Sequence, residues 1–234
     1  MRKLIYVPII HTDPDMGSLA PEMEKWANEV VGGENWRNHQ KAVNLYWRQL
    51  AGYWESKKVA GVKIFQDGMA ANGAVGKRII EELAQKGSIN YQIIEQLLQK
   101  GAILIKTEDP ILLKEEYFLT KELLKKKSFL GGLIATLWYK WKKDKLLTQR
   151  DVYIAKAINE NLQEGEMGIC FLGAYHQLLP QLPPDILVVP LKNLDKIKEY
   201  YRKFISQKWE GRVNKLSRCL TAPVKVRLGK NYDD

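Results

Sequence analysis

Two of the three histidines in the chain follow short apolar runs that have the composition of buried strands. His11 comes directly after LIYVPII, and His176 stands three residues beyond GICFLG. A glutamate, Glu108, follows a third such run, AILIK. Imidazole and carboxylate groups gathered at one point either bind a divalent metal or move protons as general acid and base. The chemistry of this chain is therefore expected just beyond its strands.

The elements that position these residues follow from the apolar pattern. Short β-branched runs alternate with segments of helical periodicity, which favours an α/β fold: a mostly parallel central sheet of about five or six strands, with helices on both faces. The predicted strands cover residues 4–10, 62–65, 102–106, 168–173 and 186–190, and the alternating run PVKVRL at 223–228 is a candidate edge strand.

Apolar residues at helical spacing, with glycines as stops, predict the helices. Asp109 is expected to cap a helix that begins at Pro110. This Lys-rich stretch is expected to break near Ser128 or Gly131, and Thr148 is expected to cap the helix that follows it. The predicted helices cover residues 19–31, 35–57, 75–86, 91–100, 110–145, 150–165 and 193–209. His39 lies inside the second of them, on an aromatic face, and is interpreted as structural.

Ligands of open parallel sheets bind outside the carboxyl ends of the strands. Gln66 and Asp67 follow the second strand, so they join His11, Glu108 and His176 at that edge. We expect His11, Glu108 and His176 to point to a shared cavity. The alternative interpretation stays open, because loops at strand ends are polar in many proteins.

The amino-acid composition restricts the classes of protein to which the chain can belong. The 234 residues, 45% hydrophobic and 27% charged, fit one globular domain, 1–234. Two cysteines and no disulfide framework favour a reducing compartment, so we expect a soluble protein of the cytoplasm. The amino terminus lacks the features of a signal peptide, and no apolar run approaches the roughly 20 residues of a membrane span.

The net charge of +10 is concentrated in two places. Residues 120–150 contain nine Lys and Arg against two Asp and Glu, and residues 198–230 contain ten against two. We therefore expect a basic helical insertion around 111–147 and a basic C-terminal segment at 198–230. Such segments either attract nucleic acid, an anionic membrane surface or an acidic partner, or are solvated Lys-rich faces.

One stretch resembles a known family. RDVYIAKAINENLQEGEMGICFLGAYH, from Arg150 to His176, is similar to the Arg-led helix, strand and GxxH motif of the TraB/GumN/TIKI-like superfamily, which is related to the erythromycin esterase and ChaN-like proteins. AILIKTEDP resembles the strand that delivers a family glutamate, here Glu108, and YVPIIHTDPDMGS resembles the first histidine motif, although its glycine is missing. The likeness spans most of residues 4–180, and the last motif is the specific one.

The resemblance implies a hydrolase, peptidase- or esterase-like, acting on a small molecule or a peptide. In that interpretation His11, Glu108, Arg150 and His176 are catalytic, and Arg150 holds a substrate carboxylate or stabilises transition-state charge. A divalent metal (manganese, cobalt or zinc) would be held by His11, Glu108 and His176. The predicted substrate-binding residues are Gln66, Asp67 and Tyr175.

A second hypothesis comes from a position at which the chain departs from the family pattern. Gln66 stands where the family often has a glutamate, and an amide is a weak ligand that cannot act as a base. The alternative is therefore a catalytically degenerate scaffold that binds nucleic acid, an anionic membrane or an acidic partner through its basic segments.

Overall fold

Apolar, β-branched runs form a five-stranded sheet in the computed structural model, which describes residues 1–125, 133–205, 212–229 and 232. All four strand pairs are parallel. The strands lie in the order β3-β2-β4-β1-β5. They are β1 (Arg2–Ile9), β2 (Lys63–Gln66), β3 (Ile103–Ile105), β4 (Met167–Gly173) and β5 (Ile186–Pro190). The prediction of an α/β fold with a parallel sheet is confirmed.

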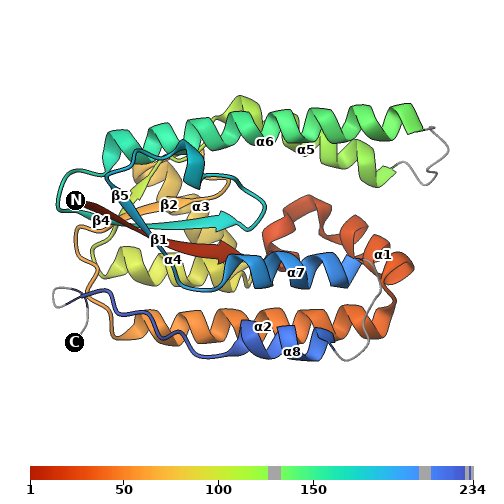
Figure 1. Cartoon of the computed structure of the whole chain (residues 1–234), viewed down its shortest axis with the longest axis horizontal. Coiled ribbons are helices and arrows are strands. Elements are labelled where there is room, and N and C mark those ends of the chain that lie inside the picture. The colour runs from red at the N-terminus through yellow and green to blue at the C-terminus, as the bar shows by residue number, and fades with distance from the viewer. Residues whose placement is uncertain (126–132, 206–211, 230–231, 233–234) are drawn as a thin grey trace.

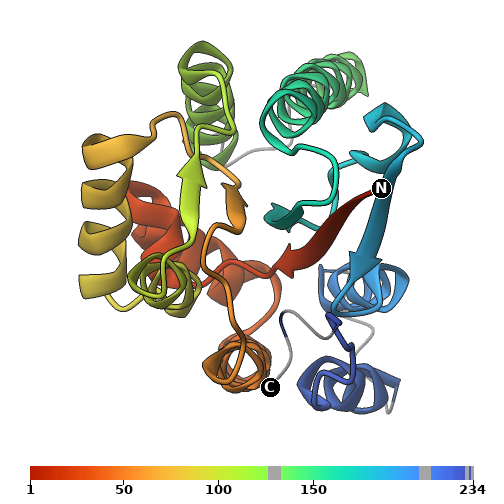
Figure 2. The same ribbon diagram turned by 90° about the vertical axis from the view of Figure 1, so that its left-hand side faces the viewer.

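Helices cover both faces of this sheet (Figures 1 and 2). On one face lie α2, α3, α4, α7 and α8, and on the other lie α5 and α6. The helices are α1 (Ala20–Val30), α2 (Gly33–Glu55), α3 (Gly73–Gln85), α4 (Ile89–Gln99), α5 (Pro110–Lys125), α6 (Leu133–Asn161), α7 (Leu194–Ile205) and α8 (Arg212–Thr221), with short 3₁₀ turns η1 (Asp13–Leu19) and η2 (Leu179–Gln181).

Side chains alternate between two cores, as the pleat of a strand requires. Ile5, Val7 and Ile9 of β1 face the larger core, with α2, α4 and α7. Leu4 and Tyr6 face the smaller core, against α6. Strands buried on both faces explain why the sequence shows continuous apolar runs.

Helix α2 fixes the end of β1. Two adjacent aromatic residues of α2, both fully buried, donate hydrogen bonds to backbone carbonyls there: Tyr46 to Pro8, and the Trp47 Nε1 to Ile10 at 2.8 Å. Position 11 is thereby set where the strand leaves the core.

Three expectations about the elements are wrong. Residues 223–228 are not a strand: they form no ladder and run along α2, where the Tyr53 hydroxyl donates to the Val226 carbonyl at 3.0 Å. Thr148 caps no helix, because α6 runs through it and its hydroxyl donates to the Asp144 carbonyl within the helix at 2.9 Å. No helix is predicted after residue 209, yet α8 covers Arg212–Thr221; the predicted helix at 193–209 is α7, and residues 206–209 lie outside the described ranges.

Two further predictions have different outcomes. Asp109 does cap α5, because its Oδ1 accepts from the Ile111 backbone N–H at 2.7 Å. The expected break near Ser128 or Gly131 lies outside the described residues. The described parts of the Lys-rich stretch predicted around 111–147, which are residues 111–125 and 133–147, lie in α5 and α6 between β3 and β4.

Candidate functional site

The order of the strands places a topological switch between β2 and β4. The connection from β2 leads outward to β3, whereas the connection from β4 leads the other way, past β1, to β5. Crossovers that leave neighbouring strands in opposite directions separate at the carboxyl ends and open a crevice there, where α/β proteins bind ligands. Asp67 and His176 follow the two strands at this switch, and His11 follows β1, the next strand along.

Arg150 is at the centre of a buried ion cluster just beyond β2 and β3. Its Nε and Nη2 lie 3.2 and 2.5 Å from the two oxygens of Glu108, and its Nη2 also lies 2.6 Å from the Asp67 Oδ1. Its Nη1 contacts Glu116 of α5. Arg150 is 3% exposed and Glu108 fully buried, so the fork-shaped guanidinium neutralises carboxylates taken out of water.

His176 lies between two aspartates. Its Nδ1 donates to the Asp151 Oδ1 at 2.6 Å, and its Nε2 lies 3.5 Å from the Asp67 Oδ2. Asp151 also accepts from the backbone N–H of Gln177 at 2.8 Å. Asp67 thus joins the two halves of the cluster, with Arg150 on one oxygen and His176 on the other.

Two adjacent residues of α6 contact the two halves of the ion cluster. Successive helical residues are about 100° apart, so Arg150 and Asp151 both face the sheet but diverge. Arg150 reaches the loops after β2 and β3, and Asp151 reaches the loop after β4.

Gly173, at the end of β4, makes room for this arrangement. A Cβ at this position would lie 3.2 Å from the Asp67 Oδ2 and 3.4 Å from the His176 Cδ2. Its backbone N–H donates to the same Asp67 oxygen at 3.0 Å. A side chain here would push Asp67 and His176 apart.

Opposing effects set the protonation of the cluster. Burial lowers the pKa of His176, but the hydrogen bonds to Asp151 and Asp67 outweigh it and raise that pKa to about 9. Burial raises the pKa of Asp67, yet its hydrogen bond to His176 and the positive charges around it hold the pKa well below the usual value. Burial raises the pKa of Glu108 to about 7, against the influence of Arg150. At neutral pH His176 is therefore an imidazolium between carboxylates.

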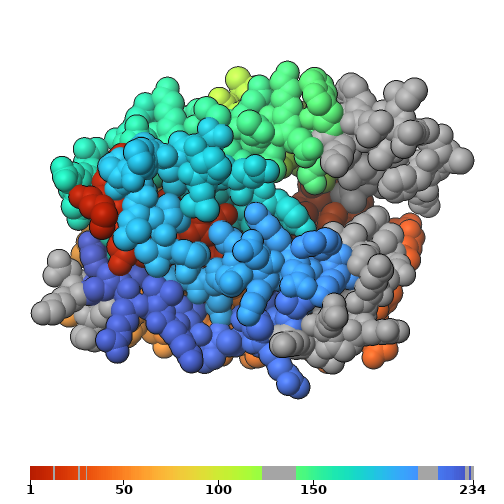
Figure 3. Space-filling view, viewed as in Figure 1, coloured from red at the N-terminus to blue at the C-terminus, as the bar shows by residue number. Residues whose placement is uncertain are grey.

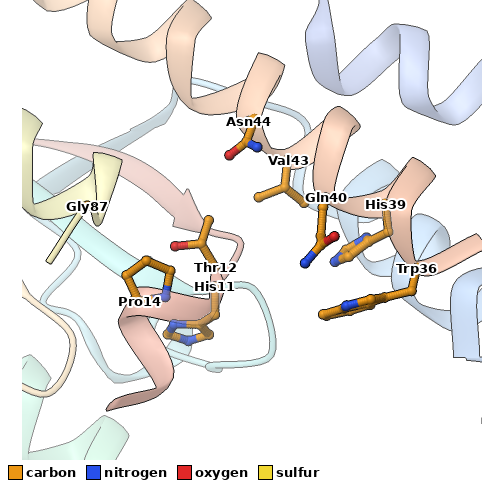
Figure 4. A pocket seen from close by; sticks show the side chains of 9 residues that line it. All are labelled: His11, Thr12, Pro14, Trp36, His39, Gln40, Val43, Asn44 and Gly87. Atoms are coloured by element: carbon orange, nitrogen blue, oxygen red, sulfur yellow. The ribbon is translucent and has the colours of Figure 1, made fainter. Parts of the chain in front are cut away.

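His11 belongs to a different environment. It is exposed, and its imidazole has no hydrogen-bond partner among the described residues. It lines a pocket of about 350 Å³ between the turn after β1 and helix α2 (Figure 4). The pocket is lined by His11, Thr12, Pro14, Trp36, His39, Gln40, Val43, Asn44 and Gly87. His11 and Trp36 face each other across its opening, and none of the lining residues is an acid, a lysine or an arginine.

The molecular surface is hollowed near this end of the sheet. Figure 3 shows a recess between the green helix α6 and the blue helix α7, with dark red atoms of the N-terminal part of the chain behind it. In Figure 1 the arrow of β1 points toward the same region.

His39 is structural, as predicted. It is buried in an aromatic cluster, its Nδ1 lies 2.9 Å from the Tyr200 hydroxyl, and its ring stacks on Phe204 with centroids 4.2 Å apart. Burial lowers its pKa to about 4, so the imidazole is neutral at pH 7.

The structure therefore brings together some of the candidate residues and not others. Glu108 and His176 are linked through Arg150 and Asp67, whereas His11 lines the neighbouring pocket. Gln66 is buried, and its Oε1 has no hydrogen-bond partner in the described part of the chain. Tyr175 is 52% exposed beside Tyr201, at the surface of the loop after β4.

The predicted metal ligands do not fit a metal in this arrangement. Both oxygens of Glu108 are bound by Arg150, and both ring nitrogens of His176 face aspartates. A divalent cation at Glu108 would have to displace the guanidinium. Across the described ranges, no group of three or more His, Cys, Asp or Glu side chains is arranged to hold a metal ion.

Two residues of the ion cluster were not predicted from the sequence. Asp151 and Glu116 lie within helices, so no strand-end signal marks them. Asp151 could have been noticed as the acid directly after Arg150, but nothing local pairs it with His176, 25 residues away.

Comparisons of the chain with protein-family models, with curated proteins and with solved structures gave no significant match.

Proposed function

We propose that this chain is a hydrolase that works by proton transfer at the carboxyl ends of β1, β2 and β4. The observation that carries the proposal is His176 between Asp151 and Asp67, next to the topological switch of the sheet. A buried histidine with a strongly displaced pKa and an oriented ring has the features of a catalytic proton carrier.

Each residue has a part in this proposal. His176, protonated at neutral pH, donates a proton to the leaving group or stabilises negative charge on a carbonyl oxygen. Asp151 fixes its ring, and Asp67 holds its charge, as the carboxylate does in a catalytic triad. Arg150 favours the ionised form of Asp67 and holds Glu108 in place, and it is a positioning residue because its nitrogens are engaged by carboxylates.

His11 is the proposed general base. It is exposed in the pocket, just beyond the end of β1, the strand next to β4, where a substrate and an attacking water would meet. The neutral lining of that pocket suits an uncharged part of an ester or peptide substrate, which agrees with the family resemblance. The two cysteines, Cys170 and Cys219, are free thiols, which supports the cytoplasm as the compartment.

The test is an assay of the whole chain on nitrophenyl esters and fluorogenic peptides, with chelator and with added manganese, cobalt or zinc. His176→Ala and His176→Gln should lower the rate by about 100- to 10,000-fold while the circular dichroism stays native. Lys156→Ala, on the exposed face of α6, is the control. Wild-type activity should decrease as the pH rises through about 9. Full activity in both His176 variants would contradict the proposal.

A binding scaffold is the second candidate, and one observation favours it. Arg150 is 3% exposed and ion-paired with three carboxylates, so its guanidinium is not available to bind a substrate. On this hypothesis the cluster only stabilises the fold. Absence of hydrolysis across the substrate panel, together with retained ligand binding by His176→Gln, would favour it.

A further inference from the structure

The outer faces of α5 and α6 carry exposed apolar side chains beside lysines. Ile111 and Phe118 of α5 are 67% and 51% exposed, and Trp141 and Val152 of α6 are 59% and 51% exposed. Soluble surfaces expose single apolar residues commonly, but four large ones on two neighbouring helices form a pattern.

The spacing of these residues gives each helix one continuous outer stripe. On α5 the positions follow i, i+3, i+7 and i+10, and on α6 they follow i, i+4, i+7 and i+11, which is one face of an α-helix in both cases. We call the two stripes together the outer face; it consists of Ile111, Lys114, Phe118 and Lys121 on α5, and Trp141, Lys145, Thr148 and Val152 on α6.

Both stripes point away from the sheet. The opposite side of α6 carries the buried Leu146 and Arg150, and that of α5 carries the buried Leu119 and also Glu116, which contacts Arg150. The two helices are in contact and lie side by side over the sheet (Figure 2). Their outer sides therefore form one surface of the molecule.

Lysines lie over the exposed rings of this face. The Lys145 Nζ is 5.2 Å from the centroid of Trp141, and the Lys114 Nζ is 6.0 Å from that of Phe118. Beside the stripe, the Lys121 Nζ is 5.5 Å from the ring of Tyr117. Aromatic rings paired with lysine ammonium groups suit a headgroup layer, where the ring enters the acyl boundary and the charge meets lipid phosphate.

We propose that the outer face docks on an anionic lipid surface, lying in the interface without crossing it. Nucleic acid would match the lysines, but it offers nothing for Ile111 and Val152, whereas the acyl boundary buries them. The charge complementarity lies on α6, where Lys142, Lys143 and Lys145 follow Trp141 against a single acid, Asp144. On α5, Lys114 and Lys121 are balanced by the exposed Glu115 and Glu122, so that helix contributes mainly its apolar side chains. No helix in the described ranges is long and apolar enough to span a bilayer.

The experiment is co-sedimentation of the full chain with vesicles of phosphatidylcholine, alone or mixed with phosphatidylserine. We expect binding to the mixed vesicles that weakens in high salt, and little binding to phosphatidylcholine alone. Phe118→Ala combined with Trp141→Ala should weaken partitioning by about tenfold or more. Each of Lys114→Gln and Lys145→Gln should weaken it by about fivefold.

Matched controls lie elsewhere on the surface. Val75→Ala on α3, where the side chain is 65% exposed, and Lys86→Gln after that helix should leave partitioning unchanged. Circular dichroism confirms that each variant folds. No binding to mixed vesicles in low salt would overturn the proposal, and so would equal losses in variants and controls. Binding to duplex DNA or RNA that exceeds vesicle binding and is unaffected by Phe118→Ala would overturn it in favour of nucleic acid.

Discussion

Two buried histidines of this chain lie in opposite environments. His39 is surrounded by aromatic rings and by a tyrosine hydroxyl, and burial lowers its pKa to about 4. His176 is equally inaccessible but touches two aspartates, and its pKa rises to about 9. The same side chain is thus a neutral packing element in one place and a cation in the other. What surrounds a histidine, rather than its burial, decides which chemistry it can perform.

The largest effect is expected from Arg150→Met. The substitution leaves Glu108 and Asp67 buried without their cation, and breaking a buried pair in this way costs about 3–5 kcal/mol of unfolding free energy. Urea denaturation of the wild type and the variant measures it. Lys156→Met, whose side chain is 69% exposed on the same helix, should change stability by less than about 1 kcal/mol. A near-neutral Arg150→Met would mean that the carboxylates of the cluster are not ionised.

The second expectation concerns alkaline pH. The folded-state pKa of His176 is raised from 6.5 to about 9, so its contribution to stability is fully present below pH 6.5 and is lost as the pH rises through about 9. The loss corresponds to about 3 kcal/mol. Denaturation at a series of pH values measures this loss. Asp151→Asn should reduce the slope of the unfolding free energy against pH. An unchanged slope in that variant would exclude Asp151 as the main partner.

The aromatic cluster should respond in the opposite direction. The folded-state pKa of His39 is lowered from 6.5 to about 4, so the protein loses stability as the pH falls from 6.5 toward 4. His39→Phe should remove this acid-side loss. At neutral pH the same substitution should lower the free energy of unfolding by about 1 kcal/mol, because the hydrogen bond with Tyr200 is lost while the ring packing is kept. Denaturation of both proteins at neutral and at acid pH measures the two effects. Equal acid sensitivity of variant and wild type would contradict this assignment.

The sequence predicts the sheet well and the ion cluster only in part. Strands buried on both faces produce apolar runs that are readable in the chain, and the end of each run locates His11, Asp67, Glu108 and His176. The strand order is not readable, and it is what brings Asp67, after β2, beside His176, after β4. Asp151 comes from a helix that the sequence divides wrongly at Thr148, since a threonine in a helix interior looks like a cap. PVKVRL alternates like a strand, but it packs along α2 without pairing.

The most direct test of the account is an NMR titration of the imidazole side chains in the whole protein. With only three histidines in the chain, each can be assigned by single substitution. We predict that His176 titrates near pH 9, that Asp67→Asn lowers this value, and that His39 stays neutral down to about pH 4. A His176 that titrates at or below the ordinary histidine value of about 6.5 would contradict the claim that two aspartates hold it as an imidazolium.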